Sequence, residues 1–337
     1  MGFVTGAQNF DVVSLGDVVT DEFIHLPNGP VRVRVDEEGR WLEIPLGIKL
    51  VVGEDSSPSA GGSAANAAVA MSRLGIHVGL ASYLAHDQIG LDILSAMRGE
   101  DVGTDLVHVD SPSHTVRNFV LSFGNERTIL VRHADFNYKW KGFRDHEVPA
   151  WLYVNSLGPD ALSYQDELAD WLDAHPNVRL AFQPGTFQVE AGTKRLRRMY
   201  ERAEVLLCSQ VAAQAIAETP SGDVSSMLDA LMKLGPRSVV VFNETDGALA
   251  AHERERLSIG EFFEEDPPLD VTGAGDAFAA TIVAALVREV PLREALRWAP
   301  VNAAAVSRQF GTQTGLLRLK DLVDRLDAAP EFIARDR

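Results

Sequence analysis

Short apolar runs recur along this chain and are separated, over most of its length, by segments long enough to form helices. Residues 64–75 and 89–99 have helical patterns, and Gly75 stands where a helix commonly ends. Continuous apolar strands that alternate with helices are typical of parallel sheets buried on both faces. The alternation therefore predicts an α/β fold in which helices cover both faces of a mainly parallel central sheet. The expected strands lie at 11–19, 78–84, 151–157, 178–184, 203–209 and 238–242.

Two stretches depart from this rhythm and have the period-two pattern of half-exposed hairpins. Residues 31–44 alternate apolar and charged side chains around an acidic turn, and residues 115–133 turn at a glycine. A sheet with one solvated face does not belong in the centre of a sheet that is covered on both sides. We therefore expect one main domain over residues 1–337, with a small β-lid inserted from about 26–60 and 114–135. The alternative is a pair of surface ribbons that have no part in binding.

The charge of the chain excludes several kinds of partner. Asp and Glu total 48 against 31 Lys and Arg among 337 residues, which gives a net charge of −17. A chain this acidic is poorly suited to nucleic acid or to an anionic membrane, so an anion must be bound by local groups such as backbone N–H donors. No signal peptide and no run of 18 apolar residues is recognisable, and the single cysteine, Cys208, excludes an internal disulfide. We expect a cytoplasmic protein that binds neither nucleic acid nor membrane.

The stretch 268–281, with the sequence PLDVTGAGDAFAAT, combines small residues with a carboxylate. From position 276 to 287 the residues are apolar nearly all round, which predicts a buried helix. Gly273, Ala274 and Gly275 then lie at its N-terminus, where small side chains let a ligand approach the backbone. The first N–H groups of a helix lack an internal partner and carry partial positive charge. The segment therefore predicts an anion site that needs no Lys or Arg.

Asp276 follows these residues in the first turn of the expected helix. Phosphoryl transfer needs fixed donors that face the transferred group, and a carboxylate that accepts the proton of the attacking hydroxyl. Asp276 could serve as that base, or it could simply stabilise the helix N-terminus. The segment is not a Walker A loop, because no Lys follows the glycines. It also lacks the third glycine of the dinucleotide-binding fingerprint, which makes a nucleotide-dependent oxidoreductase the weaker interpretation of the sheet pattern.

Residues 270–278, DVTGAGDAF, closely resemble the C-terminal signature of the ribokinase-like (PfkB) carbohydrate kinases, with Val271 as the one mild difference. The resemblance implies that Asp276 is the catalytic base and that the Gly273–Gly275 backbone forms the anion hole. It also implies ATP as the phosphoryl donor and Mg²⁺ bridging its phosphates. Two further sets are implied: Thr272, Gly247 and Asn302 for the nucleotide, and Asp270, Thr272 and Gly311 for a monovalent cation such as K⁺.

Residues 61–68, GGSAANAA, are similar to the second signature of the same family, Gly-Gly-x-x-x-Asn-x-Ala. Gly61 and Gly62 allow close approach at the start of a helix, and Asn66 offers both a donor and an acceptor to a sugar hydroxyl. The alternative is an ordinary glycine-rich start of a helix with an exposed Asn. Paired with the C-terminal signature, the segment favours a binding site for a sugar or nucleoside.

Two carboxylates, Asp17 and Asp21, lie near the end of the first expected strand. Open α/β sheets bind ligands at the carboxyl ends of their strands, and carboxylates there can accept protons from sugar hydroxyls. Asp21 also resembles the acidic residue of the family's first sugar-contacting segment, whereas a turn is the alternative for Asp17. The lid, with Phe119 or its neighbours, is expected to close over the acceptor and exclude water.

The resemblance covers residues 11–326, but two elements on the nucleotide side are altered. Ser209 and Ala212 stand where the family has the Asn and Glu of an Asn-x-x-Glu motif tied to magnesium and phosphate. Phe242 and Glu244 replace the Thr and Gly of a Thr-x-Gly element that helps to hold the nucleotide. These changes remove one carboxylate and add a negative charge near the expected polyphosphate, which should weaken ATP binding.

Two functions are therefore consistent with the sequence. The first is a kinase that transfers the terminal phosphoryl of ATP, or of another nucleotide, to a hydroxyl of a sugar or nucleoside. The second is a relative with the same fold that binds a sugar or nucleoside with weak or no catalysis, because the nucleotide-side motifs are altered. The resemblance also implies a homodimer formed through the lid.

Overall fold

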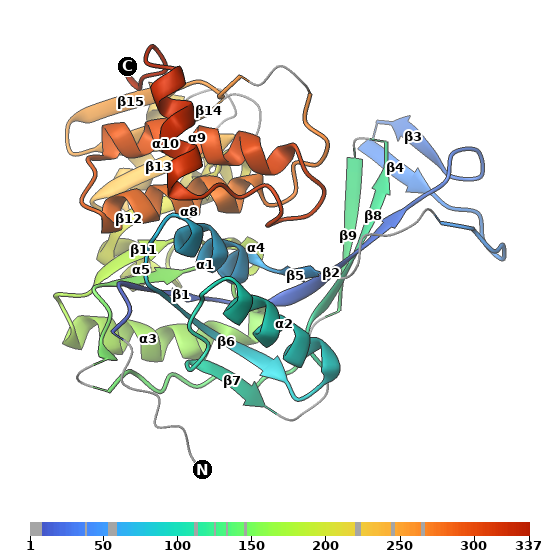
Figure 1. The fold of residues 1–337 in the computed structure, drawn as a ribbon, viewed down its shortest axis with the longest axis horizontal. Coiled ribbons are helices and arrows are strands. Elements are labelled where there is room, and N and C mark those ends of the chain that lie inside the picture. Colours follow the sequence, from blue (N-terminus) through green and yellow to red (C-terminus); the bar gives the residue numbers. More distant parts are fainter. Residues whose placement is uncertain are drawn as a thin grey trace.

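The computed structural model describes residues 9–37, 39–52, 59–110, 114–124, 126–132, 134–144, 147–219, 224–243, 247–263 and 267–337. Within these residues the largest feature is a ten-stranded sheet with helices on both faces (Figure 1). In sheet order its strands are β16 (Arg335–Asp336), β15 (Glu255–Ile259), β14 (Gly247–His252), β13 (Ser238–Asn243), β12 (Ala203–Ser209), β11 (Arg179–Phe182), β10 (Trp151–Val154), β1 (Val12–Leu15), β6 (Val78–Ala85) and β7 (Val107–Asp110). From β13 to β7 all neighbours are parallel, whereas β14, β15 and β16 extend one edge antiparallel. The predicted mainly parallel α/β fold is confirmed.

Helices cover both faces because successive strand residues point to opposite sides. Val12 and Val240 belong to one buried cluster, and Val13 and Val239 belong to the other. The first cluster includes α1 (Ser63–Arg73), α2 (Gln88–Gly99), α8 (Ala274–Val287), α9 (Leu292–Ser307) and α10 (Leu319–Ala328). The second includes the short 3-10 helix η2 (Pro159–Ala161), α3 (Leu162–Ala174), α4 (Thr186–Ala191), α5 (Arg197–Arg202), α6 (Gln210–Ala217) and α7 (Val224–Lys233).

The two helices that matter most for a ligand site, α1 and α8, lie where the sequence predicts them. α1 ends just before Gly75, whose φ of +79° takes the chain out of the helix. Nearly every side chain of α8 after its first turn is buried, as its apolar sequence predicts. In the described part of the chain, no helix is both long and apolar enough to cross a membrane.

A second, smaller sheet projects from one side of the main sheet (Figure 1). Its strands, in order, are β5 (Ser59–Gly61), β2 (Val19–His25), β8 (Arg117–Phe123) and β9 (Glu126–Arg132). The strands β8 and β9 form one of the two predicted hairpins. The other is the pair β3 (Arg32–Asp36) and β4 (Gly39–Glu43), which lies at the far end of the second sheet.

The prediction of one strand over residues 11–19 is wrong. The main-sheet strand β1 ends at Leu15, and Val19 already begins β2 of the second sheet. The second sheet therefore begins seven residues before the expected lid boundary at residue 26. Apolar composition does not mark the break because Val18 and Val19 are themselves buried in the junction between the sheets.

Candidate active site

The start of α8 lies at the carboxyl edge of the parallel strands. Gln183, the first residue after β11, donates a hydrogen bond to the Asp276 carboxylate. The ring of Phe242, near the end of β13, lies against Gly275. The carboxyl ends of parallel strands are the usual ligand-binding edge of open α/β sheets. The predicted anion segment is therefore in the place where a ligand is expected.

Gly273 gives this segment its shape. It is the N-cap of α8 and has a φ of +84°. A Cβ atom at this position would lie 2.8 Å from Cα of Thr312, so both the conformation and the close contact require glycine. The Gly273 carbonyl accepts the bond from Ala277 N–H at 2.9 Å, which leaves the N–H groups of Gly275 and Asp276 ahead of the helical ladder. Such groups at a helix start can face an anion.

Asp276 projects from the first turn of α8 and receives an amide on each carboxylate oxygen. Asn66 Nδ2, from α1, donates to Oδ2 at 2.8 Å, and Gln183 Nε2 donates to Oδ1 at 3.4 Å. Burial raises the pKa of the Asp276 carboxyl above its ordinary value, and hydrogen bonds with Asn66, Ser63 and Gln183 offset this only in part. The two signatures, 210 residues apart in the sequence, thus meet through one hydrogen bond.

Asp21 is a buried carboxyl close to the half-buried Asp276. It lies on β2, is 6% exposed, and accepts a hydrogen bond from Asn118 Nδ2 of β8 at 2.9 Å. Burial raises the pKa of Asp21, the Asn118 bond lowers it, and the negative charges of Asp276 and Asp270 raise it further. Asp21 and Asp276 are therefore close enough for their charges to interact, which suits two groups that face one ligand.

The glycine pair at the start of α1 is required by close contacts within the protein. A Cβ atom on Gly61 would fall 2.2 Å from Oδ2 of Asp21. Gly62 has a φ of +88°, and its Cβ atom would fall 2.7 Å from the Asp17 carbonyl oxygen. The glycines therefore let the start of α1 pack directly against the strand that carries Asp21.

Asp17 is held by a different set of groups. Its Oδ1 accepts the hydroxyl of Tyr138 at 2.7 Å, and its Oδ2 accepts the backbone N–H of Gly158 at 2.6 Å. Burial, followed by the charge of Asp17, raises the pKa of Tyr138 far above its usual range, so the phenol stays protonated and donates. The Asp17 carboxylate thus ties the end of β1 to the loop after β10.

The side chain that the second sheet brings to Asp21 is Asn118 rather than Phe119. Asn118 and Asp21 are opposite one another in the register of β2 and β8. Since successive strand residues point to opposite faces, Phe119 lies on the other face of β8, where Arg117 stacks over its ring at 5.8 Å. The expectation named Phe119 or its neighbours, and the neighbour that hydrogen-bonds Asp21 is Asn118.

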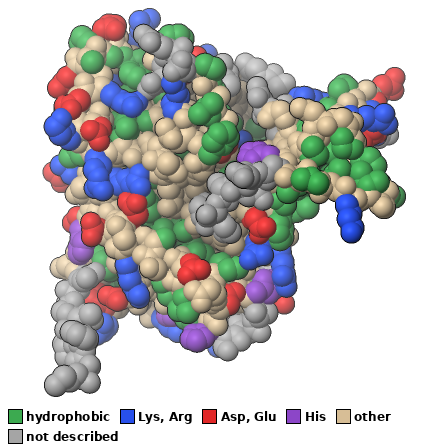
Figure 2. All heavy atoms as spheres, turned by 45° about the vertical axis from the view of Figure 1, so that its right-hand side comes forward, with side chains coloured by type: hydrophobic (Ala, Val, Ile, Leu, Met, Phe, Trp, Pro, Cys, Tyr) green, Lys and Arg blue, Asp and Glu red, His purple; other side chains and the backbone are tan. Residues whose placement is uncertain are grey.

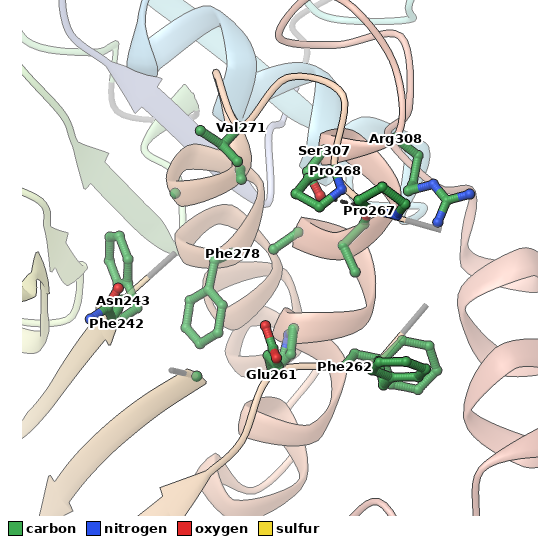
Figure 3. Close-up of a pocket in the computed structure, with 17 residues that line it drawn as sticks. Phe242, Asn243, Glu261, Phe262, Pro267, Pro268, Val271, Phe278, Ser307 and Arg308 are labelled. Carbon is green, nitrogen blue, oxygen red and sulfur yellow. Dashed lines mark hydrogen bonds between the residues drawn. The ribbon is translucent and has the colours of Figure 1, made fainter. Parts of the chain in front are cut away.

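A cavity of about 610 Å³ opens beside the start of α8 (Figure 3). Its walls are mostly apolar, with a few polar side chains, which is typical of a site for a flat organic ligand. The predicted residues Gly247, Ala274 and Gly275 line it. The other lining residues are Phe242, Asn243, Glu261, Phe262, Phe263, Pro267, Pro268, Val271, Phe278, Pro300, Ala303, Ala304, Ser307 and Arg308.

The expectation that Asn302 contacts a nucleotide needs correction. Asn302 is completely buried; its Nδ2 donates to Thr281 of α8 at 2.9 Å, and its Oδ1 accepts Leu317 N–H at 2.9 Å. The turn of α9 points this residue inward and brings the next two residues, Ala303 and Ala304, to the cavity wall. Asn302 therefore joins α8, α9 and the segment before α10.

The altered nucleotide-side motifs have clear local structures. Ser209 caps α6 by accepting the N–H of Ala212 at 3.2 Å, and Ala212 supplies no carboxylate. Phe242 stacks on Phe278 with ring centroids 5.3 Å apart. Its Cε2 would lie 3.1 Å from a Cβ atom on Gly275, so an apolar ring borders the anion segment. Glu244 lies outside the described residues.

The three residues expected near a monovalent cation are brought together. Oδ1 of Asp270 accepts both the N–H and the hydroxyl of Thr272, at 2.9 and 2.6 Å, and Oδ2 accepts Gly311 N–H at 3.2 Å. The Asp270 carboxylate thus joins the turn at Thr272 to the backbone of Gly311 beside the start of α8. Among the described residues, no group of three His, Cys, Asp or Glu side chains could hold a metal ion alone.

Three functional candidates were missed by sequence reasoning: Gln183, Asn118 and Gln313. Gln183 directly follows a strand, and a polar residue at that edge of an α/β sheet is a recognisable signal. Asn118 could have been found from the alternation of β8. Gln313 bonds Asn66 across 247 residues, and a single sequence holds no signal for such a contact.

Comparison with known proteins agrees with this geometry. The family model described as pfkB family carbohydrate kinase matches residues 49–318. The ribokinase of Bacillus subtilis (strain 168) is 25% identical over 280 residues, which cover 81% of this chain and 89% of that protein. The nucleoside kinase of Methanothermobacter thermautotrophicus is 23% identical over 276 residues, covering 80% and 84%.

A solved structure shows the same fold over almost the whole chain. The ribokinase of Arabidopsis thaliana, complexed with ribose and ATP, superposes with a TM-score of 0.78 at 17% identity. The match covers 95% of this chain and 99% of that one. With the family match spanning most of the chain, this chain belongs to the pfkB family of carbohydrate kinases and is a phosphotransferase with the ribokinase-like α/β fold.

Proposed function

We propose that this protein transfers the terminal phosphoryl of ATP to a hydroxyl of a sugar or nucleoside, with Asp276 as the base. The observation that carries the proposal is the position of Asp276. Its carboxylate stands in the first turn of α8, beside the Gly273–Gly275 segment, and is oriented by amides from α1 and from the residue that follows β11. Phosphoryl transfer needs backbone donors that face the transferred group and a carboxylate that accepts the proton of the attacking hydroxyl. A carboxylate beside a helix N-terminus provides both.

The proton step follows from the environment of Asp276. Its carboxylate accepts the proton of the acceptor hydroxyl as the oxygen attacks the terminal phosphorus, and the nucleoside diphosphate leaves with the bonding electrons. Burial raises the pKa of Asp276, which makes the carboxylate a stronger base than an ordinary aspartate. The backbone N–H groups of Gly275 and its neighbours face the charge on the transferred group.

We place the acceptor between α1 and the second sheet. Asp21 accepts a hydrogen bond from one hydroxyl of the acceptor, and its charge interacts with that of Asp276, which Asn66 contacts. Gly61 and Gly62 let these groups converge, and Asp17 supports the neighbouring loop. The second sheet acts as the lid in this proposal, with Asn118 as its contact to the site. Its closure excludes the water that would otherwise compete as acceptor.

We place the nucleotide in the 610 Å³ cavity. The aromatic and small residues of its walls suit an adenine ring, and Gly275, which lines the cavity at the start of α8, lets phosphates approach the backbone there. The Arabidopsis ribokinase was solved with ribose and ATP, which supports ATP as the donor. Mg²⁺ bound with the nucleotide would neutralise phosphate charge. A monovalent cation such as K⁺ is placed at Asp270, Thr272 and Gly311.

Two observations favour the second candidate, a binding protein with weak catalysis. Phe242 presents a ring, rather than a hydroxyl, to the anion segment, and Ala212 lacks the carboxylate that would organise metal-bound water. Both changes should lower the affinity for the phosphates of the nucleotide, and neither alters the residues proposed to bind the acceptor. Acceptor binding without turnover by any nucleotide would support this candidate.

The experiment compares wild type with Asp276→Asn. ADP release is measured with ATP, Mg²⁺ and a panel of pentoses, hexoses and nucleosides. Turnover should depend on the acceptor and fall by about 10²- to 10⁴-fold in the variant, the usual contribution of a general base. Asp105→Asn, at an exposed aspartate in a turn, is the matched control and should retain full activity. Acceptor-independent ATP hydrolysis that Asp276→Asn leaves unchanged would contradict the proposal.

Asp276→Asn is also expected to change the stability of the protein. Because the pKa of Asp276 is raised in the folded protein, the folded state binds the proton more tightly than the unfolded state. Above both pKa values, the ionised carboxylate therefore reduces the free energy of unfolding. Asp276→Asn should raise the melting temperature at pH 7.5, and this gain should shrink as the pH falls through the folded-state pKa. A lower melting temperature at pH 7.5 would argue against a strained, functional carboxylate.

A further inference from the structure

The two amides that hold Asp276 are themselves held in one orientation. A side-chain amide can present either its NH₂ group or its oxygen, and only the NH₂ group can donate to a carboxylate. Asn66 presents Nδ2 to Asp276 at 2.8 Å, and its own oxygen points the other way. Rotation by half a turn would place the Asn66 oxygen against the carboxylate and would repel it.

Gln313 decides which end of Asn66 faces Asp276. Gln313 Nε2 donates to the backbone carbonyl of Ala60 at 2.8 Å and to Oδ1 of Asn66 at 3.0 Å. A backbone carbonyl can only accept, so the Gln313 group that faces Ala60 must be NH₂. The same NH₂ group reaches Asn66, whose oxygen must therefore face Gln313. The Ala60 carbonyl thus orients the Gln313 amide, and Gln313 orients the Asn66 amide, whose NH₂ group donates to Asp276.

The other oxygen of Asp276 has a similar arrangement. The hydroxyl of Tyr153, on β10, donates to Oε1 of Gln183, which directs Gln183 Nε2 to Asp276 Oδ1 at 3.4 Å. Burial and the charge of Asp276 raise the pKa of Tyr153, so the phenol keeps its proton and remains a donor. The longer bond from Gln183 makes this the weaker of the two supports.

We propose that Gln313 is a positioning residue that locks the Asn66 amide so that it donates to Asp276 and keeps the base ionised and aimed at the acceptor. The inference rests on the proposed function of Asp276 as the base. It assigns a role to the segment 311–315, which carries Gln313 into the site from the far end of the chain.

The charges around Asp276 give the direction of the expected effect. Asp21 of β2 is a negative neighbour, and Asp270, just before α8, adds to the negative charge around Asp21. Tyr153 of β10 is neutral and faces it, α1 contributes Ser63 and Asn66, and β11 contributes Gln183. Burial and the neighbouring carboxylate both favour protonation of Asp276. Losing the oriented Asn66 donor must therefore raise its pKa.

The test follows the protonation of Asp276 through the NMR signal of its hydrogen-bond partner, Asn66. In protein labelled with ¹⁵N only in asparagine, the Asn66 side-chain amide signal, assigned by its loss in Asn66→Ser, should shift with pH as Asp276 takes up its proton. In Gln313→Leu the midpoint should rise by about one pH unit, the effect of losing one hydrogen bond to a charged group. Gln313→Glu has the same shape but cannot donate to Ala60, and should raise the midpoint at least as far.

Matched variants separate this role from a general loss of structure. Asp276→Asn should abolish the titration, and Gln309→Leu, at an exposed glutamine just before the same segment, should leave the midpoint unchanged. An unchanged midpoint in both folded Gln313 variants would overturn the inference. A second experiment measures kcat/KM against pH for wild type and Gln313→Leu. The pH at which kcat/KM falls on the acidic side should rise by the same amount as the midpoint of the NMR signal. If the midpoint of the Asn66 titration shifts in Gln313→Leu but the wild type shows no phosphoryl transfer, the role of Gln313 stands and the kinase function is refuted.

Discussion

Gly61 shows how one absent side chain can shape the acceptor side of this site. A Cβ atom at position 61 would fall 2.2 Å from Oδ2 of Asp21, so Gly61→Ala must displace that carboxylate. We predict that the KM for the acceptor rises about tenfold, the loss expected for one hydrogen bond to a charged group. The KM for ATP should remain within about twofold, because the cavity for the nucleotide does not include this residue. Steady-state kinetics with each substrate varied in turn is the measurement.

Gly99→Ala is the matched control for this variant. Gly99 ends α2, and a Cβ atom there would meet no atom within 4 Å. Its kinetics should equal those of wild type. Equal increases of both KM values in Gly61→Ala would indicate general distortion rather than displacement of Asp21.

The positions of site residues in the fold were predictable from the sequence where a short motif carried them. Gly273 and Asp276 sit at a recognisable helix start, and their local geometry follows from neighbours in the chain. Asn302 also sits in a helix, but the direction of its side chain depends on how α9 packs against α8, which local sequence does not determine. Gln313 was unpredictable because its role depends on Asn66 and Ala60, which adjoin it only in the folded chain.

At the scale of elements, the pattern of apolar residues predicted the hairpins and α8. It did not predict that the chain passes from one sheet to the other between β1 and β2. Both hairpins alternate apolar and polar residues, and α8 is apolar all round, so each pattern had one simple explanation. The run over residues 11–19 is apolar for two different reasons: β1 is buried in the main sheet, and Val18 and Val19 are buried where the chain passes into the second sheet. Burial alone cannot distinguish one long strand from two short ones.

The end of β13 offers a test of the altered nucleotide side. Phe242 stacks on Phe278 and borders Gly275, where a hydroxyl could instead donate to a phosphate. We predict that Phe242→Thr lowers the KM for ATP about three- to tenfold, since a hydrogen bond to a charged group replaces an apolar contact. The KM for the acceptor should not change, because Phe242 lies on the nucleotide side of α8. Isothermal titration with a non-hydrolysable ATP analogue gives the same comparison without turnover.

Loss of a large buried ring also has a cost in stability. Phe242 is 6% exposed, and truncation of a buried aromatic side chain typically lowers the free energy of unfolding by about 3–5 kcal/mol. Phe242→Leu is therefore the control, because it shortens the ring and adds no hydroxyl. If Phe242→Leu lowers the KM for ATP as much as Phe242→Thr does, the effect comes from space rather than from a hydrogen bond.

At the scale of the whole molecule, the second sheet and its hairpin stand away from the main body and expose apolar side chains (Figures 1 and 2). The edge strand β9 has Ile129, Leu130 and Val131 between 45% and 51% exposed, although successive side chains point to opposite faces. On the hairpin, Val35 is 70% exposed and Trp41 is 42% exposed. Apolar groups gathered on a projecting sheet with an open edge are typical of an interaction surface.

We predict that a second copy of this chain covers that sheet, as the family resemblance implies for the lid. Light scattering after size-exclusion chromatography should give the mass of a dimer at micromolar concentration, and Leu130→Glu should give the mass of a monomer. Val211→Glu, on α6 and far from this sheet in the sequence, is the control; Val211 is 77% exposed and its substitution should leave the dimer intact. A monomeric wild type would refute the prediction. Because β8 of the same sheet carries Asn118 to Asp21, the monomeric variant should also show a higher KM for the acceptor and an unchanged KM for ATP.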